Sequence, residues 1–248
     1  MRVTVTDDGR YFASFVVEAE EAALPAQTNE DGSEAEIALD LGLYHFSVDQ
    51  HGVAIDNPRC LRRAERRLKK AQRAVSRKQR GSRNRAKARQ RLARAHARVA
   101  DTRADWLHQH TTRLVRENQA IYIEDLAVQG LSRGRLAKSV HDAAWGQFRR
   151  LLEEKARRWG RTVVAVDRYE PTSRMCSHCG HVDGPKPLSV RTWTCPACAA
   201  VHDRDTNAAN NILALGRGER RNACGADVGP PRAAAVGGEA GTHRPVSA

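Results

Sequence analysis

Two pairs of cysteines constrain this chain more than any other feature. Cys176 and Cys179 form one Cys-x-x-Cys knuckle, and Cys195 and Cys198 form a second one after fifteen intervening residues. Two tight turns that each supply two thiolates are typical of a structural zinc site, whose preferred geometry is tetrahedral. Four sulfur ligands leave no position for water, so the pattern predicts a Zn²⁺ ion that organises a loop.

Three acidic residues outside the cysteines indicate a second metal site. Asp40 and Glu124 end apolar runs with the pattern of strands, and Asp205 follows Cys198 by seven residues. Hydrolysis of a phosphodiester needs an activated water and a cation beside the leaving oxygen, and two Mg²⁺ ions held by carboxylates supply both. Each acid also has a simpler interpretation, as a turn residue, a strand end or, for Asp205, a helix cap. Asp203 is a weaker candidate, because it lies further from the start of the predicted helix.

The order of the predicted elements indicates the fold class. Short strands at 37–55 are followed by helices, a strand at 120–124, a helix, a strand at 162–166 and a last helix from 206. This order is the outline of an α/β, RNase H-like fold, in which acids end the first and fourth strands and begin the last helix. We expect a β-hairpin at 1–18, an acidic linker at 19–36, the RNase H-like nuclease core at 37–174 and 200–216, a basic helical hairpin inserted at 57–118, a zinc ribbon at 175–199 and a disordered tail at 217–248.

Positive charge is concentrated in one part of the chain. The sequence carries 42 Lys and Arg against 29 Asp and Glu, a net charge of +13, which predicts a polyanionic partner. Eighteen of these cations and a single acid, Glu65, lie between Arg59 and Arg98. Such a one-sided helix surface favours contact with nucleic-acid phosphates over a merely solvated face. The candidate nucleic-acid-binding residues in this stretch are Arg77, Lys78, Arg80, Arg83, Arg85 and Lys87.

The sequence contains no apolar run long enough to span a membrane and no signal-peptide pattern. We therefore expect a cytoplasmic protein, associated with the nucleoid when bound to DNA, whose paired cysteines hold metal in a reducing compartment. Cys60 and Cys224 stand apart from the two knuckles, and we expect both to be isolated free thiols.

Five segments resemble the TnpB family, the OrfB proteins of insertion sequences, which are related to type V CRISPR effectors. The similarity runs from Ile37 to Gly216, and its segments are Leu39–Gly42, Ser76–Arg85, Ile123–Leu126, Thr172–Gly180 and Asp203–Ile212. The resemblance implies a RuvC-type DNA nuclease with a zinc-ribbon insertion, guided by RNA from the transposon end. By motif position, Asp40, Glu124 and Asp205 match the family's catalytic acids, and the four cysteines match its zinc ligands.

The chain departs from this family pattern at two places. Members carry recognition and wedge domains before the nuclease, whereas 36 residues precede Ile37 here. We therefore expect an N-terminally shortened copy, whose hairpin at 1–18 is the remainder of a wedge domain. The second departure is Ala199, where glycine commonly follows the knuckle.

Two functions are compatible with these patterns. The first is a transposon-encoded, Mg²⁺-dependent endodeoxyribonuclease that has DNA and guide RNA as partners, with Arg174 or Arg191 neutralising the scissile phosphate. The alternative is a truncated remnant that binds nucleic acid without cutting it. A zinc-ribbon transcription regulator would explain the cysteines but would leave Asp40 and Glu124 without a role.

Overall fold

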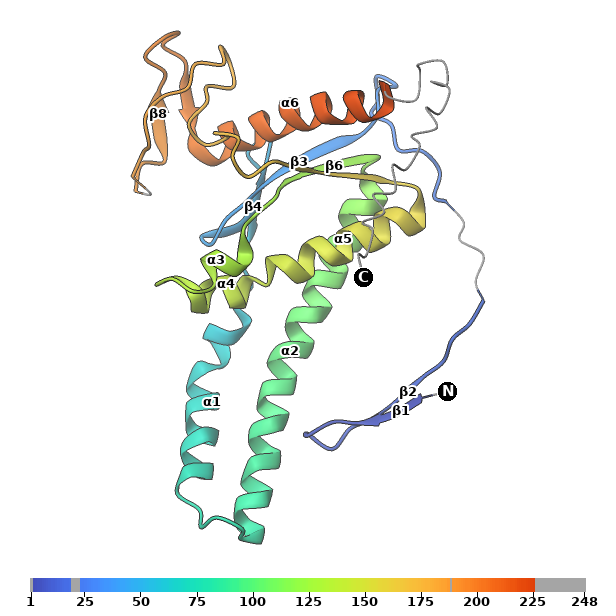
Figure 1. Ribbon diagram of the computed structural model, residues 1–248, viewed down its shortest axis with the longest axis vertical. Helices are drawn as coiled ribbons and strands as arrows, with labels where there is room; N and C mark the ends of the chain where they lie inside the picture. The colour runs from blue at the N-terminus through green and yellow to red at the C-terminus, as the bar shows by residue number, and fades with distance from the viewer. Residues whose placement is uncertain (1, 19–22, 188, 226–248) are drawn as a thin grey trace, which may run out of the picture.

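A five-stranded mixed sheet forms the centre of the computed structural model, which describes residues 2–18, 23–187 and 189–225 (Figure 1). In spatial order the strands are β5 (Ala54–Asp56), β4 (His45–Asp49), β3 (Glu36–Leu41), β6 (Ala120–Glu124) and β7 (Thr162–Val166). β3 pairs antiparallel with β4 and in parallel with β6, β4 pairs antiparallel with β5, and β6 pairs in parallel with β7. The structure thereby confirms the short strands predicted at 37–55 and the two later strands.

Helices cover both faces of this sheet. The covering helices are α2 (Arg83–Glu117) and α5 (Trp145–Trp159) on one face and α6 (Arg204–Gly225) on the other. Ala38 and Leu39 are neighbours on β3, yet Ala38 packs in the cluster that contains α6 residues and Leu39 in the cluster formed with α2 and α5. Successive side chains of a strand point to opposite faces, so the apolar strands of the core need a helix on each side.

A long helical hairpin leaves the sheet after β5 (Figure 1). Its first helix is α1 (Cys60–Ser76), and α2 returns to the sheet, in agreement with the helices predicted within 57–118. Leu68 of α1 packs against Ala95 and Val99 of α2, along the narrow seam that apolar residues spaced by three and four produce. Cys60, at the start of α1, is buried and forms no disulfide, as expected.

Two short helices, α3 (Val128–Leu131) and α4 (Ala137–Ala143), connect β6 to α5 and support the base of the hairpin. The carboxylate of Asp142 on α4 is buried and accepts two backbone N–H groups of the first turn of α1, at 2.8 and 3.2 Å. Arg103 of α2 pairs with the same carboxylate at 3.1 Å. Asp142 therefore caps α1, which has no side-chain cap of its own, and links both helices of the hairpin to the sheet.

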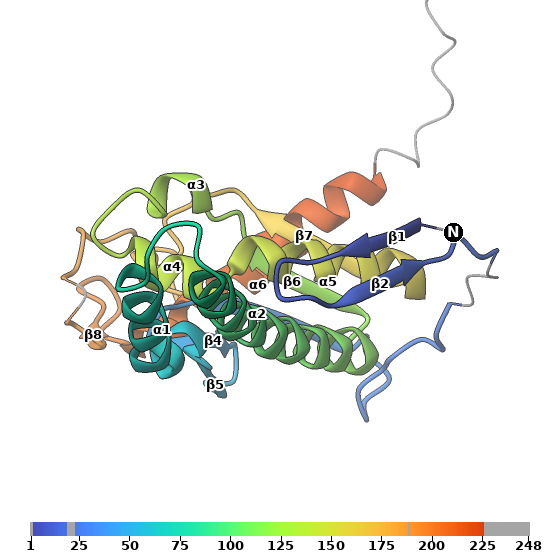
Figure 2. The same ribbon diagram turned by 90° about the horizontal axis from the view of Figure 1, so that it is seen from below.

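A β-hairpin precedes the sheet, as predicted for 1–18, and consists of β1 (Arg2–Val5) and β2 (Tyr11–Ser14) (Figure 2). It contacts α2 through an ion pair between Arg10 and Asp101 at 2.7 Å. Of the predicted linker, residues 19–22 lie outside the described part of the chain.

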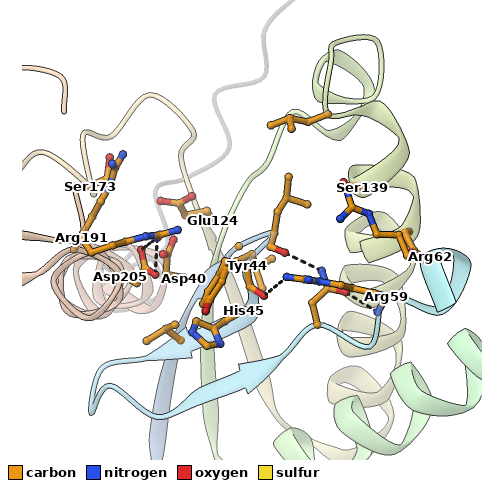
Figure 3. Close-up of a pocket in the computed structure, with 18 residues that line it drawn as sticks. Asp40, Tyr44, His45, Arg59, Arg62, Glu124, Ser139, Ser173, Arg191 and Asp205 are labelled. Atoms are coloured by element: carbon orange, nitrogen blue, oxygen red, sulfur yellow. Dashed lines mark hydrogen bonds and ion pairs between the residues drawn. The ribbon is translucent and has the colours of Figure 1, made fainter. Parts of the chain in front are cut away.

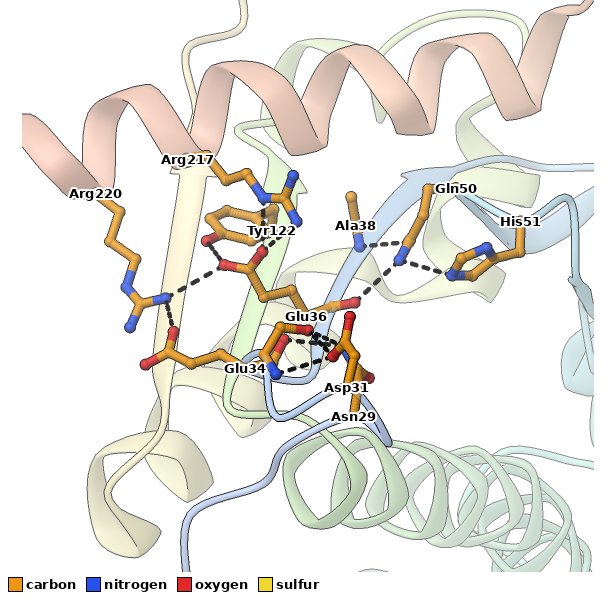
Figure 4. A network of polar contacts seen from close by, with 11 residues as sticks. Asn29, Asp31, Glu34, Glu36, Ala38, Gln50, His51, Tyr122, Arg217 and Arg220 are labelled. Carbon is orange, nitrogen blue, oxygen red and sulfur yellow. Dashed lines mark hydrogen bonds and ion pairs between the residues drawn. The ribbon is translucent and has the colours of Figure 1, made fainter.

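Helix α6 continues to Gly225, so the prediction of a disordered tail from residue 217 is wrong for residues 217–225. Arg217 and Arg220 in this stretch pair with Glu36 of β3 at 2.6 and 3.3 Å (Figure 4). These ion pairs connect basic residues after 216 to Glu36, the last residue of the predicted linker. They hold α6 over the sheet. The rest of the expected tail, 226–248, and the side chain of Cys224 lie outside the described residues.

The cysteine segment forms a small antiparallel hairpin of β8 (Thr192–Thr194) and β9 (Val201–Asp203) beside the start of α6. β9 lies wholly beyond the predicted end of the zinc ribbon at residue 199 and leads directly into α6. Within the described ranges, no helix is long and apolar enough to cross a membrane.

Candidate metal and nucleic-acid site

The three predicted acids line one groove, although they lie far apart in the sequence (Figure 3). Asp40 is near the end of β3 and Glu124 is the last residue of β6. These strands are parallel neighbours, so their carboxyl ends lie at the same edge of the sheet. Asp205, in the first turn of α6, reaches this edge because α6 packs across β3 and β6. The groove has a volume of about 570 Å³.

The charges of these carboxylates act on one another. Burial raises the pKa of Asp40 well above its usual range, and the negative charges of Glu124 and Asp205 raise it further. Burial also raises the pKa of Glu124, while a hydrogen bond from the Thr172 hydroxyl opposes that shift. Carboxylates gathered in this way disfavour their own ionisation unless a cation joins them, so the site would gain stability from bound positive charge.

The structure separates the roles of the two neighbouring aspartates. Asp203 caps α6, because its Oδ1 accepts the backbone N–H of Thr206 at 2.9 Å. Asp205 instead accepts both carboxylate contacts from one guanidinium nitrogen of Arg191, at 3.1 Å each. The alternative in which Asp205 only caps the helix is therefore wrong, and its side chain is available to the groove.

The acids suit a hard divalent cation by their chemistry, since carboxylate oxygens are the ligands that Mg²⁺ prefers. The three acids are more widely spaced than the cysteines. Among the described residues, only the four cysteines form a group of three or more potential metal ligands whose donor atoms all lie within 4.8 Å of one another. An open set of acids leaves room for water and a phosphate beside a metal ion.

The four cysteines form a compact cluster that fits a zinc ion. The Sγ atoms of Cys176 and Cys198 are 3.7 Å apart, and those of Cys179 and Cys195 are also 3.7 Å apart. A tetrahedral site with Zn–S bonds of about 2.3 Å has sulfur–sulfur edges of roughly 3.8 Å. His202 Nε2 lies 3.0 Å from Cys176 Sγ, where it can donate to a thiolate and orient it.

The candidate nucleic-acid-binding cations of the hairpin do not join the acids. They are mostly exposed and surround the turn between α1 and α2, while the groove with the acids reaches only the base of α1. Seventeen helical residues separate base and tip, a length of roughly 25 Å. The acid of this stretch, Glu65, pairs with Lys69 and Lys138. Arg174 is exposed and does not line the groove.

Sequence reasoning missed three residues that line the groove beside the acids: Tyr44, Arg59 and Arg62. Tyr44 was assigned only to a strand, and the two arginines were counted within the basic stretch as a whole. The feature that distinguishes Arg59, a backbone φ of 45°, is visible only in the structure.

Known proteins resemble this chain over most of its length. Residues 14–135 match the family model OrfB_IS605, described as a probable transposase, and residues 145–212 match the model of the Cas12f1-like TNB domain. A "Putative RNA-guided DNA endonuclease" of Streptomyces pristinaespiralis is 47% identical over 233 residues, which are 93% of this chain and 56% of that protein. The "Putative RNA-guided DNA endonuclease InsQ" of Escherichia coli is 34% identical over 133 residues, 47% of this chain and 33% of that protein. These matches confirm the resemblance of this chain to the TnpB family.

Solved structures share the fold. A CRISPR-Cas12f ternary complex superposes with a TM-score of 0.52 at 16% identity, covering 82% of this chain and 41% of the other. A Cas12f1-sgRNA-target DNA complex gives a TM-score of 0.50, also at 16% identity, with 71% and 48% covered. This chain therefore spans about half the length of the relatives it matches.

Proposed function

We propose that this chain is a metal-dependent DNA endonuclease with an RNase H-like core of RuvC type. The observation that carries the proposal is the meeting of Asp40, Glu124 and Asp205 in one groove, where their charges act on one another. The resemblance to the TnpB family supports the same reaction class, because two relatives carry the name "Putative RNA-guided DNA endonuclease".

The three acids would hold Mg²⁺, which supplies a nucleophilic water and neutralises charge on the leaving oxygen. The other residues of the groove orient and balance this site. Thr172 donates a hydrogen bond to Glu124 and fixes the direction of that carboxylate. Arg191 contacts Asp205, so its guanidinium is placed to neutralise a phosphate at the same position, which favours Arg191 over Arg174 for this role.

The zinc module would support catalysis by holding nearby residues of the groove in place. Cys195 and Cys198 lie between β8 and β9, β9 leads into α6, and Arg191 immediately precedes β8. A Zn²⁺ ion in the cysteine cluster would therefore fix both Arg191 and Asp205 relative to Asp40, without taking part in the reaction.

DNA and a guide RNA are the proposed partners. One solved structure of this fold is a Cas12f1-sgRNA-target DNA complex, and the exposed cations of α1 and α2 provide a surface for phosphates. This chain spans 56% of the length of its Streptomyces relative. We therefore propose RNA guidance for this chain as well and do not take it over from the relative.

The test is cleavage of single- and double-stranded DNA by the purified chain with Mg²⁺, with and without RNA copurified from the native locus. Asp40→Asn should lower the rate at least about 10³-fold, since it removes a metal ligand. Asp105→Asn, an exposed aspartate of α2 outside the groove, is the matched control and should cut normally. Cutting that survives Asp40→Asn or a chelator of Mg²⁺ would contradict the proposal.

A nucleic-acid-binding chain that does not cut is the second candidate. It is favoured by the location of the hairpin cations, which lie apart from the acids and can bind phosphates without them. Salt-sensitive binding of DNA with no cleavage under any of the above conditions would select this candidate.

A further inference from the structure

The groove that contains the acids continues beyond them toward the base of the helical hairpin. At this end it is lined by Tyr44, Arg59 and Arg62 (Figure 3). In the close-up Tyr44 lies between the acids on one side and Arg59 on the other, with Arg62 further along. A strand whose phosphate sits at the acids would therefore pass over these three side chains.

Arg59 is held in place by an uncommon backbone conformation. Its φ of 45° and ψ of 46° are in the left-handed region, which residues with a Cβ rarely adopt. The backbone N–H of Arg59 donates to Asn57 at 3.1 Å, and its guanidinium donates to the carbonyl of Tyr44 at 3.4 Å. Such conformations cluster where a side chain must point at a ligand.

The two arginines carry positive charge that the described part of the chain does not neutralise. Neither guanidinium forms an ion pair there, and the nearby buried acid, Asp142, is occupied by Arg103 and by the backbone amides of α1. The anion-binding capacity at this end of the groove therefore belongs to the guanidiniums and not to the helix N-terminus.

Tyr44 offers a surface for a base. Its side chain is an exposed aromatic, with 65% of its surface accessible. Arg191 lies over the ring at 5.7 Å and His45 meets it edge-on at 4.6 Å, so neighbours hold the ring without covering it. Aromatic side chains of this kind stack unpaired bases with little dependence on sequence.

We propose that Tyr44, Arg59 and Arg62 form a binding subsite for single-stranded DNA next to the scissile phosphate. One unpaired base stacks on Tyr44, and the following backbone phosphates bind Arg59 and Arg62. This assignment rests on the proposed nuclease function for its place beside the acids, but the binding of a strand can be measured without cleavage.

The experiment uses the full chain carrying Asp40→Asn, so that DNA is not cut, and a short fluorescein-labelled single strand followed by anisotropy. Tyr44→Ala should weaken binding about tenfold, and Tyr44→Phe should bind like the parent because the ring remains. The double change Arg59→Gln/Arg62→Gln should reduce the slope of log K against log salt by about 1.4, the value for two phosphates on single-stranded DNA. The matched controls are Tyr169→Ala, another exposed aromatic, and Arg113→Gln, both outside the groove.

A second readout follows the base directly. A strand containing 2-aminopurine at successive positions should lose fluorescence at one position through stacking, and Tyr44→Ala should restore it while Tyr44→Phe does not. Thermal denaturation of each variant establishes that it is folded, and Tyr44→Leu replaces Tyr44→Ala if the smaller side chain unfolds the chain.

The outcomes separate this subsite from the proposed nuclease. If the chain never cuts DNA but the variants lose binding as described, the subsite stands and the nuclease proposal fails. The subsite is wrong if the chain without Asp40→Asn cuts DNA, but Tyr44→Ala and the double arginine variant match their controls. The quantities to match are single-strand affinity, 2-aminopurine fluorescence and salt dependence of binding. Absence of any binding of single strands by the parent also overturns it.

Discussion

His110 lies on α2 inside a group of aromatic side chains. Its ring stacks on Phe148 at 5.9 Å and lies 5.2 Å from Trp106, and its Nε2 has no hydrogen-bond partner in the described structure. Burial lowers the pKa of His110 from an ordinary value near 6.5 to about 4, with a smaller contribution from Arg113. The folded chain therefore holds this imidazole neutral.

This environment predicts an acid-sensitive contribution to stability. Because the unfolded chain takes up a proton near pH 6.5 and the folded chain only near pH 4, the stabilisation is complete above 6.5 and is lost as the pH falls toward 4. The loss amounts to about 3 kcal/mol. His110→Phe, which keeps an aromatic ring, should flatten the dependence of the unfolding free energy on pH, measured by urea denaturation. An unchanged pH profile would show that His110 is protonated alike in both states.

Asp40 should be destabilising when no cation is bound. Its raised pKa means that the folded chain prefers the protonated carboxyl, so the ionised form near neutral pH opposes folding. Asp40→Asn is therefore expected to raise the unfolding free energy by about 1 kcal/mol without Mg²⁺. Asp105→Asn should leave it unchanged. Thermal denaturation in a chelator measures both variants, and a less stable Asp40→Asn chain would contradict the electrostatic argument.

At the scale of elements, α6 depends on close approach to the sheet. Gly216 sits over Tyr122 of β6, and a Cβ on Gly216 would lie 2.3 Å from Cδ1 of that ring. Gly218, two residues later, has nothing within 4 Å of such a Cβ. The sequence predicts a disordered tail after Gly216, but this glycine lies within α6 and serves packing there.

The two glycines give a matched test of α6. Gly216→Ala should lower the unfolding free energy by about 1–3 kcal/mol, because the added methyl overpacks the interface with Tyr122. Gly218→Ala should instead stabilise the helix by up to about 1 kcal/mol. Equilibrium denaturation of both variants measures the difference, and equal effects of the two changes would show that α6 does not require this close approach.

The zinc knuckles differ at one position. Gly180 follows the first knuckle with a φ of 76°, and Ala199 follows the second with a φ of 58°. The sequence correctly marked Ala199 as a position where glycine fits better. Ala199→Gly should relieve the left-handed strain and raise stability by about 0.5 kcal/mol, while Gly180→Ala should cost about 1 kcal/mol. Thermal denaturation of the zinc-loaded chain checks both, and a destabilising Ala199→Gly would refute the strain.

At the scale of the whole molecule, local patterns predicted the elements better than their contacts. Short apolar runs predicted β3 and β6, and the three-four spacing of apolar residues predicted α1 and α2, because burial imposes these patterns. The pairing of Arg217 with Glu36 joins residues 181 positions apart, and no local pattern reports such a contact. The left-handed backbone of Arg59 was likewise invisible, since it depends on Asn57 and Tyr44 holding the turn.

The distribution of charge over the molecule leads to the last prediction. The net charge of +13 resides largely on the hairpin, and its turn exposes Arg77, Lys78 and Arg80 well away from the carboxylates of the groove.

If these three cations bind phosphates of duplex DNA, changing all three to glutamine should reduce the slope of log K against log salt by about 2.7, or 0.9 for each contact. Arg113→Gln, at the other end of α2, should leave the slope unchanged. Anisotropy titrations across a range of salt concentrations measure the slopes. A triple variant with the parent's slope would mean that the tip of the hairpin does not touch DNA, and that the cations nearer the sheet carry the binding.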